Sequence, residues 1–250
     1  MRVFVEEEAC ANIAKLTSDL QLKIGSFKYP FTEKIIENWN AVVKPEDTVY
    51  FLGDANDRGP DSWALVKEIS ADPQFIYMMG NHEYMLVKAM YDFLYEDCMG
   101  DNYQLLVANG GKTTFYDWSN EDRKEDWYFY LKNLPYIKNY TNSEGKEIIM
   151  THAGFTPYAN KDIPVKYECV WDRDHILDLW LKPENKIVVH GHTPTVYVAN
   201  DLKLSNIGNG ALWYCKNHKV CVDCGTHFTG TTCILNLDTY DEYIFSIKGE

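Results

Sequence analysis

The fold of this chain is limited most by short apolar segments that each end in a polar cluster. Four such segments occur, and each has the length and composition of a buried β-strand. In open α/β sheets ligands bind at the carboxyl ends of the strands, so we expect the clusters to meet at one site. The segments and the clusters that follow them are Thr48–Leu52 with GDANDRG, Gln74–Met79 with GNHE, Glu147–Met150 with THAG, and Lys186–Val189 with HGHTP.

Helical patterns separate the expected strands. Apolar residues recur at helical spacing from residue 31 to 43 and in a second segment that ends at Ile69. Asp61 and Ser62, at the start of the second segment, are suited to capping that helix. A mainly helical insertion is predicted over 84–134, and short antiparallel strands are predicted near the C-terminus. Alternating strands and helices with a β-rich end predict an α/β layered protein. Because the chain has no internal repeat or Pro/Gly-rich linker, we expect a single domain, residues 1–250.

The composition argues against several classes of function. The formal net charge is −13, whereas a nucleic-acid-binding protein normally carries a basic face, so we expect no nucleic-acid partner. A bound cation can still attract an anionic substrate, because it reverses the sign of the local field. No apolar run approaches the ~20 residues needed to cross a bilayer, and Met1–Val5 is followed at once by three Glu. We therefore expect a cytoplasmic protein without a membrane partner, with its seven Cys as free thiols.

The polar clusters contain Asp, Asn and His, which are ligands for Mn, Fe, Zn and similar divalent ions. A hydrolase with two metal ions needs a carboxylate that bridges them and a water between them as the nucleophile. Asp54 suits the bridging position because it is the first polar residue after its strand. Arg58, in the same cluster, carries the planar, permanently charged group that binds two phosphate oxygens. The pattern therefore indicates metal-dependent chemistry on a phosphate group.

Together the four clusters give the chain a family resemblance. GDANDRG followed by GNHE, THAG and HGHTP resembles the PPP-type serine/threonine phosphatases of the calcineurin-like metallophosphoesterase superfamily, in particular the bacterial and lambda-phage branch. Two lesser matches, WDRDH at 171–175 and VDCGT at 222–226, keep the family's order, so the resemblance spans about 16–236. It implies two mixed β-sheets flanked by helices (α/β/β/α), with two divalent metal ions at the strand ends.

The resemblance implies a set of metal ligands from which this chain departs at one position. Relatives carry an upstream D-x-H on the first strand for the first metal ion, and no D-x-H precedes residue 53 here. The best candidate is Ser18–Gln21, in which Asp19 is kept and Gln21 replaces the His; alternatively, Asp19 only caps a turn. The Gln amide oxygen is a harder ligand than imidazole, so we expect manganese to be favoured among Mn, Fe, Zn and Mg. The other implied ligands are Asp54, which bridges both ions, and Asn81, His152 and His192.

The catalytic side chains are also implied by the resemblance. His82 is the implied general acid that protonates the leaving group, and Asp57 accepts a hydrogen bond from its ring. Arg58 and Arg173 are implied as the groups that hold the phosphate. The expected function is a metal-dependent phosphomonoesterase that acts on phosphoserine or phosphothreonine in a phosphoprotein, with other phosphomonoesters as alternative substrates.

Two other functions fit the same motifs. A dinucleoside polyphosphate hydrolase shares them and differs in the surrounding loops. If Gln21 prevented binding of the first metal ion, the chain would be a catalytically silent phosphate-binding module. A binding module, however, has little use for a general acid. A zinc site in the Cys- and His-rich segment 215–224 is not expected, because strand alternation would send these side chains to opposite faces.

Overall fold

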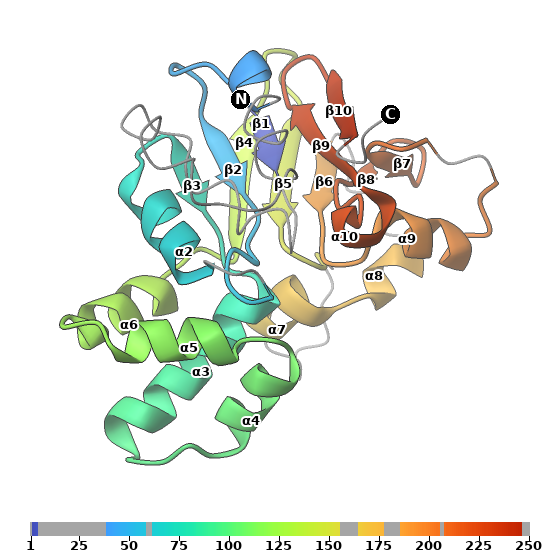
Figure 1. The fold of residues 1–250 in the computed structure, drawn as a ribbon. Coiled ribbons are helices and arrows are strands. Elements are labelled where there is room, and N and C mark those ends of the chain that lie inside the picture. The colour runs from blue at the N-terminus through green and yellow to red at the C-terminus, as the bar shows by residue number, and fades with distance from the viewer. Residues whose placement is uncertain are drawn as a thin grey trace.

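Two five-stranded β-sheets form the centre of the computed structural model (Figure 1). The structure describes residues 2–4, 39–58, 62–155, 165–177, 186–205 and 208–246. The first-metal candidates Asp19 and Gln21 lie outside the described residues. The strand order is β10-β9-β1-β2-β3 in sheet A and β4-β5-β6-β8-β7 in sheet B.

The strands and helices have the following bounds. Sheet A contains β1 (Arg2–Phe4), β2 (Val49–Phe51), β3 (Phe75–Tyr77), β9 (Thr231–Asn236) and β10 (Glu242–Ser246). Sheet B contains β4 (Ile137–Thr141), β5 (Glu147–Thr151), β6 (Lys186–His190), β7 (Leu212–Tyr214) and β8 (Lys219–Cys221). The helices are α2 (Ser62–Ala71), α3 (Asn81–Tyr95), α4 (Asp101–Ala108), α5 (Lys112–Ser119), α6 (Lys124–Lys132), α7 (Val165–Trp171), α8 (Asp174–Leu177), α9 (Thr195–Asp201) and α10 (Thr226–Thr229), and residues 39–42 are also helical.

Both sheets are mixed: sheet A has a parallel half and an antiparallel half, and sheet B has a parallel centre with antiparallel edges. In sheet A, β1, β2 and β3 pair in parallel, and β9 and β10 complete the sheet in antiparallel pairs. In sheet B, β5, β6 and β8 are parallel, while β4 and β7 are antiparallel edges. The antiparallel strands expected near the C-terminus are present in the pairs of β7 with β8 and of β9 with β10, and β8 also pairs in parallel with β6. Through this parallel pair β8 continues the order of β5 and β6 and delivers its following loop to the same edge.

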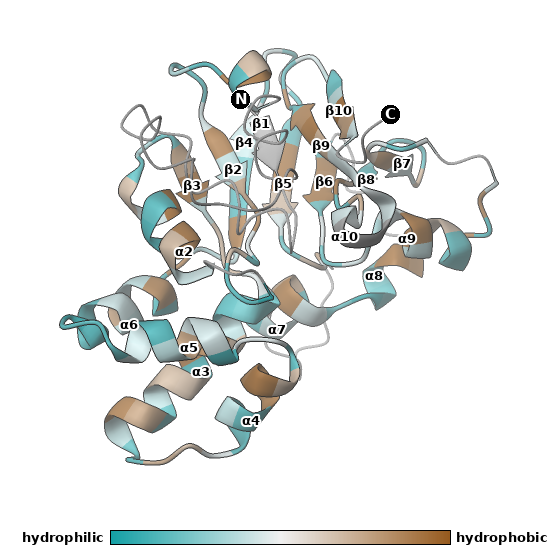
Figure 2. Ribbon diagram, viewed as in Figure 1, coloured by the Kyte–Doolittle hydropathy of each residue, from teal (hydrophilic) through white to brown (hydrophobic). Residues whose placement is uncertain are grey.

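The two sheets pack face to face through alternate residues of their strands. Tyr50 and Leu52 point from sheet A into a core shared with Ile148, Met150 and Val189 of sheet B. Their neighbours along β2 point to the opposite face, because side chains alternate with a period of two. In Figure 2 the central strands β5, β6 and β9 are correspondingly coloured as hydrophobic.

Helices cover the outer faces of both sheets. Val49 and Phe51 of sheet A lie in a large core with residues from α2 to α6. On the outer face of sheet B, Ile176 of α8 and Val198 of α9 pack with Tyr214 of β7 and Cys221 of β8. The expected α/β/β/α sandwich is therefore confirmed.

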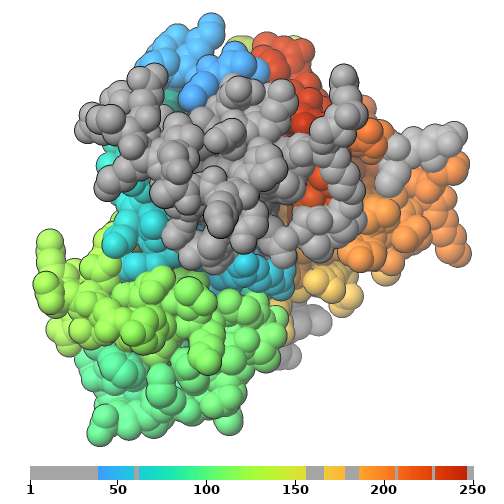
Figure 3. Space-filling view, in the orientation of Figure 1, coloured from blue at the N-terminus to red at the C-terminus, as the bar shows by residue number. Residues whose placement is uncertain are grey.

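The insertion predicted over 84–134 contains most of α3 and all of α4, α5 and α6. These helices form the lobe at the foot of the sheets, coloured green in Figure 3. Aromatic residues pack inside it: Trp118 is fully buried, and its ring centroid lies 5.2 Å from that of Phe115 and 5.7 Å from that of Phe93. Within the part of the chain that is described, no helix is long and apolar enough to cross a membrane.

Candidate metal centre

Four predicted ligands meet where the two sheets come together. Asp54 follows β2 and Asn81 begins α3 after β3, while His152 follows β5 and His192 follows β6. All four side chains are buried. The Asn81 Oδ1 atom lies 2.9 Å from His152 Nε2 and 2.9 Å from His192 Nδ1. The His152 Nε2 atom lies 3.2 Å from His192 Nδ1 and 3.4 Å from Asp54 Oδ2.

These distances match the edges of a coordination shell. Ligands held about 2.1 Å from one ion in octahedral geometry lie about 3.0 Å from their neighbours. Among the described residues, Asp54, His152 and His192 form the one group of His, Cys, Asp or Glu side chains with ligand atoms close enough to share an ion. The mixture of carboxylate, amide and imidazole ligands suits a divalent transition metal.

The protonation of His152 supports the same conclusion. Its Nδ1 atom lies 2.9 Å from the backbone carbonyl of Leu52, an acceptor, so Nδ1 carries the proton. The Nε2 lone pair is then directed at the oxygens of Asp54 and Asn81, which are also electron-rich. A cation at the centre of these atoms would remove their mutual repulsion. A hydrogen bond of this kind from the far ring nitrogen is the usual support for a metal-binding His.

Burial keeps the second histidine available as a ligand. It lowers the pKa of His192 well below its ordinary value, and the nearby positive charge of Arg173 lowers it further. The neutral imidazole is the form that binds a metal ion, so desolvation favours binding here. The contribution of Arg173 also indicates that this predicted phosphate-binding residue lies near the metal centre.

The backbone of the loop that carries Asp54 has an unusual conformation. Asp54, Asp57 and Arg58 have φ angles of 64°, 77° and 61°, in the left-handed region that L-residues rarely occupy. Each such residue costs of order 1 kcal/mol or more and persists only when its surroundings hold it. Gly53 allows this loop to pass close to the next one, because a Cβ atom there would lie 2.4 Å from the nitrogen of Gly80.

Glu83 holds this loop, a role that the sequence motifs did not predict. Its side chain is fully buried at the third position of α3. Burial raises the pKa of Glu83, while hydrogen bonds from the Asp54 backbone and Tyr77 oppose that rise. The spacing from Gly80 to Glu83 is that of a capping box, which was the available sequence signal. The carboxylate accepts hydrogen bonds from the nitrogens of Asp54 (2.7 Å), Ala55 (2.7 Å), Asn56 (3.4 Å) and Gly80 (2.9 Å), and from the Tyr77 hydroxyl (2.8 Å).

The predicted general acid and its partner lie beside the ligands. His82 Nδ1 is 2.7 Å from Asp57 Oδ2, and both side chains are buried. The backbone nitrogen of His82 also donates to Asp54 Oδ1 at 3.1 Å, which ties the acid to the metal ligand. Since Nδ1 faces Asp57, Nε2 is the nitrogen left to exchange a proton with a substrate.

The two predicted phosphate-binding arginines are both exposed. The Nε atom of Arg58 donates to the backbone carbonyl of Asn109 at 3.4 Å. Arg173 lies between α7 and α8. Of the predicted site residues, the structure therefore brings together Asp54, Asn81, His152, His192, His82 and Asp57, with Arg58 on the same loop.

The Cys-rich segment gives no second metal centre among the residues that the structure describes. Cys221 and Cys224 are buried free thiols. The Cys221 thiol donates to the backbone carbonyl of Thr193 at 3.2 Å, and that of Cys224 to Val222 at 3.8 Å. These contacts agree with the expectation of core thiols in this segment.

The family profile for calcineurin-like phosphoesterases matches residues 15–221. The chain belongs to the calcineurin-like phosphoesterase family. Members of this family bind divalent metal ions and hydrolyse phosphoesters, and the Asp–Asn–His cluster described above fits such an ion. The PPP-type branch, the number of ions and their identity are finer points that remain predictions.

Known relatives of this calcineurin-like phosphoesterase support the fold. A symmetrical bis(5'-nucleosyl)-tetraphosphatase of Delftia acidovorans is 27% identical over 112 residues, which is 44% of this chain but only 35% of that protein. A protein provisionally assigned as a diadenosine tetraphosphatase has a similar structure, with a TM-score of 0.57 and 15% identity over 99% of this chain and 95% of that one. A metallophosphoesterase from Sphaerobacter thermophilus has a TM-score of 0.54 and 14% identity, over 100% of this chain and 90% of that one. A cold-active protein tyrosine phosphatase from a Shewanella species has a TM-score of 0.54 and 12% identity, over 96% of this chain and 76% of that one.

Proposed function

We propose that the chain is a metal-dependent phosphomonoesterase that acts on phosphoserine and phosphothreonine residues of proteins. The observation that carries this proposal is the position of the His82–Asp57 pair next to the metal ligands. His82 directly follows the ligand Asn81 in the first turn of α3. When the phosphorus–oxygen bond of phosphoserine breaks, the serine side chain leaves as an alkoxide, which is a poor leaving group unless a nearby acid protonates it.

The residues of the chain divide the work of the reaction. A bound divalent ion would supply a water of lowered pKa as the nucleophile. Asp57 accepts a hydrogen bond from the Nδ1–H group of His82, which fixes one ring proton on Nδ1. The second proton of the imidazolium is then on Nε2, from where it can pass to the leaving oxygen. Arg58 and Arg173 are exposed, and their planar groups are suited to binding phosphate oxygens in pairs. Burial of the ligands and of His82 keeps water away from these groups.

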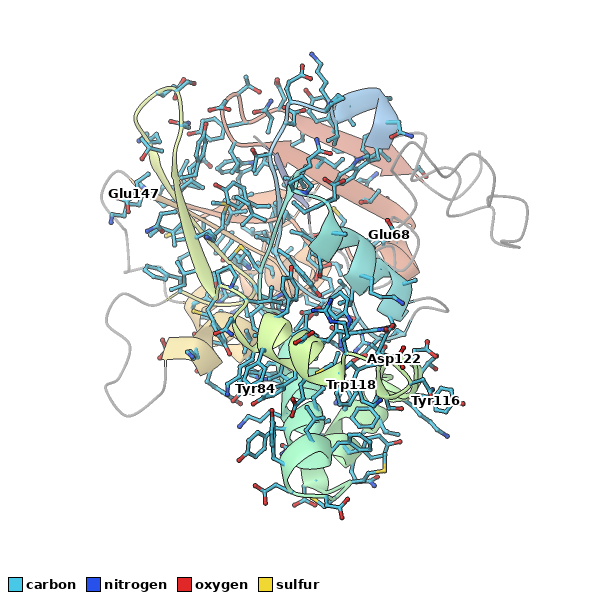
Figure 4. The ribbon with its side chains drawn as sticks, turned by 90° about the vertical axis from the view of Figure 1, so that its left-hand side faces the viewer. Glu68, Tyr84, Tyr116, Trp118, Asp122 and Glu147 are labelled. Atoms are coloured by element: carbon cyan, nitrogen blue, oxygen red, sulfur yellow. The ribbon has the colours of Figure 1, made fainter. Side chains whose placement is uncertain are left out.

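A pocket beside the metal centre supports a substrate with a sizeable organic group. Its volume is about 380 Å³, at the lower end of the range for small-molecule sites. The Trp171 ring forms one wall and meets the His192 ring edge-on, with centroids 6.0 Å apart. Tyr84, on α3 beneath the sheets (Figure 4), and Lys88 also line the pocket. An amino-acid side chain next to the phosphoresidue could enter this pocket while the phosphate lies at the metal centre.

A dinucleoside tetraphosphate is the second candidate substrate. The partial match to the Delftia tetraphosphatase favours it, and the aromatic pocket could accept a base. In that reaction the leaving group is a nucleotide, whose phosphate oxygen departs without the help of an acid. The contribution of His82 therefore distinguishes the two candidates.

The test compares substrates on one enzyme preparation. Wild-type protein with Mn²⁺, Mg²⁺, Zn²⁺ or Fe²⁺ is assayed with a phosphoserine peptide, a phosphotyrosine peptide and diadenosine tetraphosphate. We expect highest activity with Mn²⁺ and the phosphoserine peptide, and a loss of about 10²–10⁴-fold in kcat for His82→Asn. Faster turnover of the tetraphosphate, little affected by His82→Asn, would establish the second candidate instead. No turnover of any substrate with any of the four ions would contradict enzymatic function and favour a phosphate-binding module.

A further inference from the structure

The turn between α4 and α5 lies against the loop that carries Asp57 and Arg58. The backbone nitrogen of Asp57 donates to Thr114 Oγ1 at 3.1 Å. The backbone nitrogen of Arg58 donates to the Gly110 carbonyl at 3.4 Å, and its Nε donates to the Asn109 carbonyl at the same distance. The helical insertion therefore contacts two predicted catalytic residues that precede it by about fifty positions in the sequence.

Two glycines make this contact possible. Gly110 has a φ angle of 97°, and a Cβ atom there would lie 2.9 Å from Arg58 Cγ. A Cβ atom on Gly111 would lie 2.8 Å from Asp57 Oδ1 and 2.3 Å from a methyl carbon of Leu106. Side chains at these positions would push the turn away from the loop, so the close approach depends on their absence.

The loop needs such support because of its backbone conformation. Asp57 and Arg58 are adjacent residues with positive φ, and neither is a glycine. Thr114 is itself buried, with 1% of its surface exposed, so its hydroxyl offers Asp57 a hydrogen bond that water does not replace. The carboxylate of the same Asp57 holds the ring of His82 at 2.7 Å. A chain of contacts thus runs from Thr114 through Asp57 to the predicted general acid.

We propose that Thr114 and the 109–111 turn are positioning elements of the active site. Thr114 fixes the Asp57 backbone so that its carboxylate sets the orientation of His82. The carbonyl groups of Asn109 and Gly110 hold Arg58 toward the phosphate. The insertion is then part of the catalytic apparatus as well as a wall beside it. The catalytic consequence rests on the proposed phosphomonoesterase function, whereas the orientation of His82 does not.

The chain offers matched variants for a test. Thr114→Val removes the hydroxyl at nearly constant volume, and Thr114→Ser restores it. Thr113→Val makes the same change at the preceding, exposed position of α5 and serves as the control. All variants are made in the full chain and loaded with Mn²⁺, and circular dichroism and thermal melting verify that each one folds.

The assay uses two phosphomonoesters that differ in their need for an acid. A phosphoserine peptide requires protonation of its leaving group, whereas p-nitrophenyl phosphate releases a stable phenolate. For Thr114→Val we expect kcat to fall about 10–100-fold with the peptide and much less with p-nitrophenyl phosphate, with KM and Mn²⁺ affinity unchanged. Thr114→Ser should recover most of the activity. Equal losses with both substrates, or a Thr114→Val that behaves like Thr113→Val, would overturn the proposal.

A spectroscopic measurement tests the inference even if the proposed function fails. The His82 ring proton on Nδ1, held by Asp57, should give a downfield NMR signal, assigned by its loss in His82→Asn. We expect Thr114→Val to shift or broaden this signal and Thr114→Ser and Thr113→Val to leave it in place. An unchanged signal in Thr114→Val would overturn the positioning role. If the wild-type protein shows no turnover while Thr114→Val shifts the His82 signal as expected, the proposed function alone would be refuted.

Discussion

Replacement of Glu83 by Gln is the sharpest test of how the active-site loop is held. The Glu83 carboxylate accepts hydrogen bonds from four backbone N–H groups and the Tyr77 hydroxyl, and the distances from its two oxygens fix which donor meets which atom. Oε2 accepts from the nitrogens of Asp54 and Gly80, while Oε1 accepts from Ala55, Asn56 and the Tyr77 hydroxyl. Gln has nearly the same shape, but one of these two oxygens becomes an NH₂ group, which can only donate.

One orientation of the introduced amide would leave the backbone N–H groups of Ala55 and Asn56 without an acceptor, and the other keeps them and the Tyr77 hydroxyl by placing the amide oxygen at the Oε1 position. Its NH₂ group then faces the backbone N–H groups of Asp54 and Gly80, which lose their acceptor. A buried donor left without a partner costs about 1–3 kcal/mol, so the two together predict a loss of about 2–6 kcal/mol. This is a large part of the ~5–15 kcal/mol by which proteins of this kind are stable. Asp54, at φ 64°, is one of the two residues released, so Mn²⁺ affinity should also fall about 10–100-fold.

The unfolding free energy is measured by urea unfolding of the metal-free protein in the presence of a chelator. The Mn²⁺ affinity is measured separately, by calorimetric titration of folded metal-free protein without chelator. Glu68→Gln makes the same chemical change on the exposed side of α2 (Figure 4) and should alter the unfolding free energy by less than about 0.5 kcal/mol. If Glu83→Gln unfolds at the same free energy as Glu68→Gln, the carboxylate does not hold the loop. Unchanged Mn²⁺ affinity in a destabilised Glu83→Gln would separate the stability of the loop from the geometry of Asp54.

Two further predictions concern histidines. His152→Ala removes the ligand atom that lies within 3.4 Å of each of the other three, and we expect calorimetry to show Mn²⁺ affinity weakened by more than about 100-fold; an unchanged affinity would contradict the ligand assignment. Burial lowers the pKa of His175 well below its ordinary value, so the unfolded chain takes up a proton near pH 6.5 while the folded protein does not. The unfolding free energy should therefore fall as pH decreases below about 6.5, by up to about 1.4 kcal/mol per pH unit from this residue. Urea titrations at pH 7.5, 6.5 and 5.5 should show a shallower decrease for His175→Asn, and equal slopes would contradict the prediction.

The motifs at the strand ends were predictable because each is local in sequence. An apolar run followed by Asp, Asn or His identifies both a strand and its exit loop. Parallel pairing then brings Asp54 and Asn81 together at one end of sheet A, and His152 and His192 together at one end of sheet B. The alternation of strands and helices indicated an α/β layered protein, and the family resemblance implied the α/β/β/α sandwich. The parallel pair of β8 with β6 was not predicted, because a strand of three residues carries no signal for its neighbour.

The parts that sequence reasoning missed depend on contacts between distant residues. Thr114 meets Asp57 across 57 positions, and the Gly pair at 110–111 looks like an ordinary helix-to-helix turn. Glu83 belonged to a recognised motif, yet its neighbours Asn81 and His82 accounted for the motif's chemistry and left its own role unrecognised. A charged residue next to a ligand, in a segment that must be buried, is a signal for such a support.

The position of the metal centre between the sheets links catalysis to the packing of the whole fold. Sheet A supplies Asp54 and Asn81, and sheet B supplies His152 and His192, so an ion bound to all four would join the sheets. Each side is supported differently. On sheet A the loops are tied to Glu83, whereas on sheet B the ring of His152 reaches across to the Leu52 carbonyl at the end of β2. That single hydrogen bond both fixes the His152 lone pair and spans the junction of the sheets. A shift between the sheets would therefore misalign the ligand before it exposed any core residue, which makes metal affinity a more sensitive measure of sheet packing than stability.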